Sequence, residues 1–136
     1  MQPDGVSAAL RTFLKGETEA ASFRHADHVR MAFEILSHHS DFLTAAGAYA
    51  ASLRKIAARV GNANAYHETI TLAFLSLIAE RLAHHPYSSF EQFAAANPDL
   101  LDKTVLTRWY DAARLASPVA RTTFVLPGPV ASSVTA

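Results

Sequence analysis

Three of the seven histidines in this sequence fall on helix faces that should be buried. His25 and His28 stand three residues apart in F-R-H-A-D-H-V, and His67 stands in Y-H-E-T-I-T. At about 100° per residue, His25 and His28 fall on or beside the apolar face of one predicted helix, and His67 falls at the middle of the apolar face of another. A buried imidazole needs partners for its ring nitrogens, because an unpaired polar group in an apolar core costs about 1 to 3 kcal/mol.

One ion could satisfy several of these nitrogens together. Two imidazoles at i and i+3 on one helix can reach a single metal, and a third from a neighbouring helix would complete the three-ligand open site typical of catalytic zinc. His25, His28 and His67 are therefore the predicted ligands of a divalent transition metal. Without thiolates or a dense carboxylate cluster, the sequence does not distinguish zinc, iron, nickel and copper.

Two other interpretations of these histidines stand beside the metal site. They can be hydrogen-bonded core residues, or they can line a metal-free catalytic or ligand pocket. The other four histidines end two predicted helices, where imidazolium complements the helix dipole, and no function is assigned to them: His38, His39, His84 and His85.

Three further side chains are predicted to assist chemistry at the histidine site. Tyr66 and Glu68 flank His67 and could transfer protons. Arg121 could close the pocket and pair with an anionic group of the substrate, since guanidinium binds carboxylates in a fork. The alternative for Arg121 is a surface salt bridge. No residue is assigned to an organic cofactor.

The hydrophobic pattern places these residues on helices and predicts an all-α, single-domain bundle of five or six helices over residues 1–126. The fourth helix is the most apolar and should be central. Residues 122–126 should be extended and pack across the bundle, and residues 127–136 should form a flexible tail. The helices are expected at about residues 4–16, 23–37, 41–60, 63–84, 89–96 and 102–117.

Composition narrows the classes of function. Basic and acidic residues number 12 each, so the chain has no net positive charge whose electrostatic field would attract nucleic acid or an anionic membrane. The absence of cysteine excludes disulfides and thiolate sites and fits the cytoplasm. No apolar run reaches the ~18 residues of a membrane helix, and no exported leader is expected. Five glycines include no nucleotide-binding loop and no nucleophile elbow.

The sequence strings around the histidines also carry a resemblance. F-R-H-A-D-H-V, Y-H-E-T-I-T and S-P-V-A-R, the last followed by F-V, are similar to segments of an uncharacterised family of small bacterial helical proteins, across about residues 23–127. The resemblance implies no reaction. It implies that the positions to watch are His25, His28, Tyr66, His67 and Arg121.

Together these observations favour a small metal-dependent enzyme with a histidine-lined site, hydrolytic or oxygen-using, acting on a small molecule. The competing class is a non-catalytic helical module that binds a small molecule or a partner protein, in which the histidines are structural. The sequence leaves the substrate and the oligomeric state open.

Overall fold

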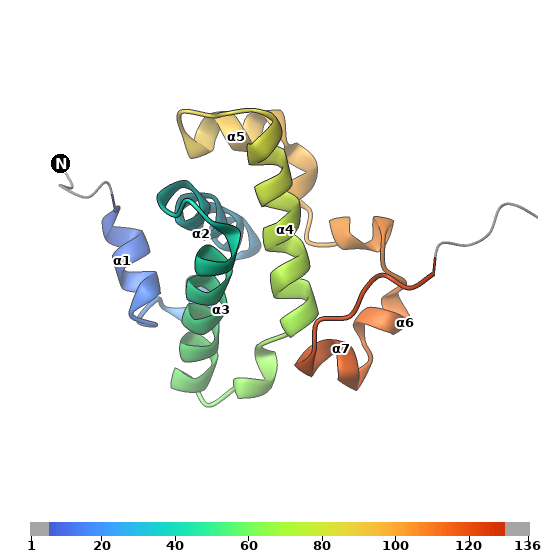
Figure 1. The fold of residues 1–136 in the computed structure, drawn as a ribbon. Helices are drawn as coiled ribbons and strands as arrows, with labels where there is room; N and C mark the ends of the chain where they lie inside the picture. The colour runs from blue at the N-terminus through green and yellow to red at the C-terminus, as the bar shows by residue number, and fades with distance from the viewer. Residues whose placement is uncertain (1–5, 130–136) are drawn as a thin grey trace, which may run out of the picture.

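The computed structural model describes residues 6–129, and this part of the chain contains seven α-helices and no β-strand (Figure 1). The all-α fold predicted from the sequence is therefore confirmed. The helices are α1 (Ala8–Leu14), α2 (His25–His38), α3 (Phe42–Arg59), α4 (Glu68–His84), α5 (Phe90–Ala96), α6 (Ala112–Leu115) and α7 (Pro118–Thr122). Short 3-10 turns cover Ala20–Ser22, Ala63–Ala65, Pro98–Leu101 and Val105–Arg108.

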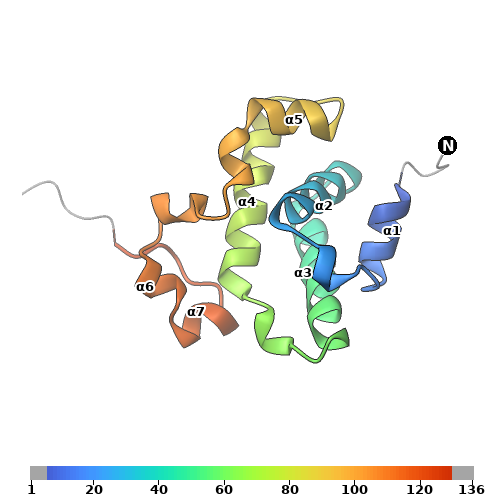
Figure 2. The same ribbon diagram turned by 180° about the vertical axis from the view of Figure 1, so that it is seen from behind.

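Helix α4 is the centre of the molecule, as its apolar sequence predicts. It contacts α2 and α3 on one side and α7 on the other (Figure 1 and Figure 2). Leu75 and Ile78 are fully buried and Phe74 nearly so, which places this helix in the core. Burial of such side chains is the main force that holds the bundle together.

The ends of α1, α2 and α3 follow local signals. Ser7 and Asp41 cap α1 and α3 by accepting backbone N–H groups with their side chains. Helix α2 begins at His25, because the Arg24 backbone N–H donates to the Asp27 carboxylate at 2.9 Å. This start places His25 and His28 in the first turns of α2, facing α3 and α4.

Helix α4 begins five residues later than the sequence pattern suggests. Ala63–Ala65 is a separate 3-10 turn, and the backbone at Tyr66 and His67 is extended. His67 is therefore the N-cap of α4 rather than an interior helix residue, and its ring accepts the backbone N–H of Ile70 at 3.1 Å.

The prediction of a single long helix from about residue 102 to 117 is also wrong. That stretch instead contains one 3-10 turn and the short helix α6, and α7 follows directly after it. Apolar residues at helical spacing cannot by themselves distinguish one helix from several turns that bury the same side chains.

The segment after α7 is extended, as predicted, although Thr122 still belongs to α7 and the segment packs at one end of α4 rather than across the bundle (Figure 1). The Thr69 hydroxyl donates to the Thr123 carbonyl at 2.7 Å and accepts the Val125 backbone N–H at 3.1 Å. Tyr110 donates to the Val125 carbonyl at 2.8 Å. These bonds fix the segment on the N-terminal end of α4. Most of the tail expected over residues 127–136 lies outside the described residues.

Arg81 on α4 anchors the turn Pro98–Leu101 beside the bundle. Its guanidinium binds the Asp99 carboxylate through two N–H groups, at 2.7 and 3.1 Å, and also reaches the Asn97 side chain at 2.8 Å. A bidentate pair of this kind fixes orientation as well as distance. The turn therefore presents the Leu100 carbonyl to α2 in a defined place.

Within residues 6–129, none of the helices has both the length and the hydropathy needed to cross a bilayer.

Candidate functional site

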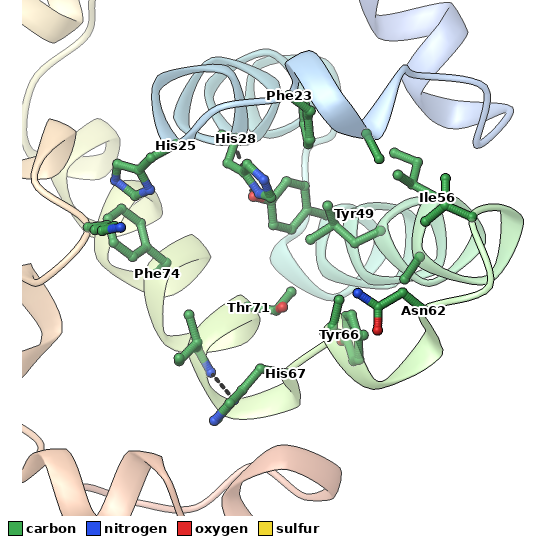
Figure 3. Close-up of a pocket in the computed structure, with 17 residues that line it drawn as sticks. Phe23, His25, His28, Tyr49, Ile56, Asn62, Tyr66, His67, Thr71 and Phe74 are labelled. Carbon is green, nitrogen blue, oxygen red and sulfur yellow. Dashed lines mark hydrogen bonds between the residues drawn. The ribbon is translucent and has the colours of Figure 1, made fainter.

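A pocket of about 560 Å³ opens between α2, α3 and α4. The wall along α3 is apolar, and polar side chains reach the pocket from α2, from α4 and from the segment that precedes α4 (Figure 3). This volume lies within the range of small-molecule sites. The residues that line the pocket include Phe23, His25, His28, Tyr49, Leu53, Ile56, Val60, Ala65, Tyr66, His67, Phe74 and Lys103.

His28 lines the pocket from the first turns of α2. Its ring stacks on Phe23, with ring centroids 4.2 Å apart, and lies next to Tyr49 (Figure 3). Among residues 6–129, no side chain or backbone group hydrogen-bonds its ring nitrogens. Burial, and to a smaller extent the nearby His25, lower the pKa of His28 to about 4 against the opposing effect of Asp27. At neutral pH the ring is uncharged, with one N–H and one lone pair unused.

His25 lies one turn before His28 and uses one of its nitrogens. Nε2 is 2.9 Å from the Leu100 carbonyl, which can only accept, so this nitrogen carries a proton. The ring meets Phe74 edge-on, with centroids 4.9 Å apart. Nδ1 is left as the second nitrogen available to a ligand.

His67 has both nitrogens occupied by the protein. Nδ1 accepts the Ile70 backbone N–H, so the proton is on Nε2, which donates to the Leu115 carbonyl at 2.7 Å. The predicted burial of His67 is confirmed, since only 8% of the residue is exposed. Its role is to cap α4 and to hold α6 against it. A metal would have to displace the Ile70 N–H to use the only lone pair on this ring.

The three histidines line one pocket, as the sequence suggested, but the described residues contain no group of three His, Asp or Glu side chains arranged to hold a metal ion. His25 and His28 are paired on α2, while His67 belongs to a different network.

Tyr66 and Glu68, predicted to transfer protons, bind each other. The Tyr66 hydroxyl donates to the Glu68 carboxylate at 2.6 Å, and Arg54 binds the same carboxylate at 3.1 Å. Arg54 also lies over the Tyr66 ring, 4.9 Å from its centroid. Burial and the bond to Glu68 raise the pKa of Tyr66 well above its usual value. Tyr66 lines the pocket, whereas Glu68 is not part of its wall.

Arg121, expected to close the pocket, points elsewhere. It lies on α7 and donates to the backbone carbonyls of Asn64 and Tyr66. It is not one of the residues lining the pocket. The guanidinium therefore ties α7 to the segment that carries Tyr66 and His67.

Two pocket residues were not identified from the sequence. Tyr49 has no part in the predicted site; its buried hydroxyl donates to the His28 carbonyl at 3.3 Å. Lys103 reaches the pocket from a turn, and an isolated lysine between turns carries no periodic signal. None of the residues in the pocket wall, all within the described part of the chain, is acidic.

No protein-family model, curated protein or solved structure matches this chain significantly.

Proposed function

We propose that this protein binds a small, largely apolar organic molecule in the pocket between α2, α3 and α4, with His28 as its main polar contact. The observation that carries the proposal is the His28 ring, which is largely buried, uncharged at neutral pH, and without a hydrogen-bond partner among the described residues. No buried side-chain nitrogen or oxygen in the described part of the chain lacks a partner, so the unpaired His28 nitrogens are open to the pocket, where a ligand group can bind them.

The apolar wall sets the character of the ligand. Tyr49, Leu53, Ile56 and Val60 form a stripe along α3 at helical spacing. At about 1.5 Å per residue, the stripe is about 16 Å long. An aliphatic or aromatic body laid along this wall would bury area worth about 25 cal/mol per Å².

The polar contacts favour binding over proton transfer. Tyr66 already donates to Glu68, and His67 uses both of its nitrogens. Neither is free to exchange a proton with a substrate without losing its structural bond. Among the histidines of the pocket, only His25 and His28 offer unused nitrogens to a bound molecule.

A variant that blocks the pocket tests the proposal. Octanol is the probe, and its binding is measured from the chemical shifts of the pocket amides. Ala65 and Ala63 are exposed on the same 3-10 turn, but only Ala65 lines the pocket. We expect Ala65→Trp to weaken octanol binding about tenfold or more, a loss of about 1.4 kcal/mol. Ala63→Trp should bind like the wild type. Equal affinity in all three proteins, or no saturable binding, would contradict the proposal.

A metal-dependent enzyme, the first interpretation of the sequence, is the second candidate, and one observation favours it. His25 and His28 face the same pocket one turn apart, and each has an unused nitrogen, which makes half of a metal site.

Titration with Zn²⁺ and Ni²⁺ separates the two candidates. Because the His67 nitrogens are engaged, we expect His67→Asn to leave any metal uptake unchanged and His28→Gln to abolish it. Uptake of one ion per chain that both substitutions abolish would restore the three-histidine site and replace the ligand-binding proposal.

A further inference from the structure

The pocket has two chemically different ends. Figure 3 shows His25 and Phe74 at one side and Ile56 and Asn62 at the other, with His28 and Tyr49 between them. Lys103 belongs to the His25 end, since it follows Leu100, the residue whose carbonyl the His25 ring binds. Lys103 therefore lines the end of the pocket where the turn that carries it meets His25, and the apolar wall of α3 leads away from that end.

Lys103 is the only fully charged side chain in the pocket wall. It is exposed, and none of the ion pairs within residues 6–129 includes it. An ammonium group on a flexible stem can turn toward a ligand at the pocket mouth while its methylene groups cover apolar surface.

The neighbouring carboxylate does not form an ion pair with this lysine. Asp102 accepts the Thr104 backbone N–H at 2.9 Å and the Thr104 hydroxyl at 2.7 Å, which caps its own turn. These bonds, with a smaller effect of His25 and Arg108, lower the pKa of Asp102. Asp102 stays charged at neutral pH and is not part of the pocket wall.

We infer that the ligand of this pocket is an amphipathic monocarboxylate, whose apolar body lies along α3 and whose carboxylate meets Lys103 and the N–H of His28. The inference rests on the proposed function and adds the chemical class of the ligand. A wall with one ammonium, the free N–H of His28 and no acidic side chain favours a single negative charge over a neutral or cationic head group. Lys103 attracts the charge at the mouth, and His28 supplies a hydrogen bond deeper in the pocket.

Three probes that share one alkyl chain test this inference: octanoate, octanol and octylamine at pH 7.5. We expect octanoate to bind about tenfold more tightly than octanol, and octylamine to bind most weakly. Lys103→Met should remove most of the preference for octanoate while leaving octanol affinity within about twofold of the wild type. Added salt should weaken octanoate binding and leave octanol binding unchanged.

Two variants serve as controls. Lys15→Met removes an exposed lysine outside the pocket and should change nothing. Asp102→Asn removes the neighbouring negative charge and should strengthen octanoate binding about two- to threefold. If octanol binds but octanoate is no better in the wild type, or if Lys103→Met keeps the preference, the carboxylate inference is overturned and the proposed function stands. If no probe binds saturably, the proposed function is overturned as well.

Discussion

Replacing His67 with alanine should lower the free energy of unfolding by about 2 to 4 kcal/mol, a large loss for a domain of this size. Two interactions disappear together. The N-cap bond to the Ile70 N–H is worth about 0.5 to 2 kcal/mol. Losing the ring also leaves the Leu115 carbonyl without its donor, which costs about 1 to 3 kcal/mol of unfolding free energy. Urea unfolding followed by circular dichroism at 222 nm measures the change.

Asparagine at position 67 separates the two contributions. Its side-chain oxygen can accept the Ile70 N–H, so His67→Asn should recover about 1 kcal/mol relative to alanine. It is too short to replace the bond to Leu115. His84→Ala, at the exposed opposite end of α4, is the control and should be nearly neutral. If His67→Ala is as neutral as His84→Ala, the ring does not hold these elements together.

The position of His67 shows where sequence periodicity stops being informative. Apolar spacing correctly predicted that α4 is the central helix and that His67 is buried. It could not locate the first residue of α4, because histidine is not among the usual N-cap residues. Two local signals did indicate a later start: asparagines at 62 and 64, which disfavour helix interiors, and Glu68, an acidic residue suited to a first helical turn.

The candidate site was predictable only where its residues lie on long helices. Helical spacing placed His25 and His28 on one inward face, and both line the pocket. The partners that decide their chemistry come from turns distant in sequence. Arg81 and Asp99 position the Leu100 carbonyl that binds His25. No periodic pattern could show this, and the roles of Arg121 and Lys103 depend on tertiary contacts in the same way.

Acidification should destabilise this protein mainly through His28. The pKa of His28 is about 4 in the folded protein, against 6.5 for an ordinary histidine. Between these values the unfolded chain binds a proton that the folded chain does not, so stability falls as the pH falls. The contribution is fully present above about pH 6.5 and is lost progressively toward pH 4. At about 1.4 kcal/mol per pKa unit, the full shift sets an upper bound of about 3 kcal/mol on the loss of unfolding free energy.

The window from pH 6.5 to 5 suits this test, because few carboxylates titrate there and comparison with His28→Gln separates His28 from the other six histidines. We expect the wild type to lose about 2 kcal/mol of unfolding free energy across it, measured by urea unfolding at each pH. His28→Gln keeps a neutral polar side chain and should flatten the slope, whereas His84→Gln should keep it. The imidazole resonances of His28 give the pKa directly by NMR. A midpoint near 6.5, or equal slopes for the wild type and His28→Gln, would mean that the ring is open to water and that the pocket does not hold it uncharged. Because the proposed function depends on an uncharged, unpaired His28, this titration also tests the premise of the ligand pocket without requiring any ligand.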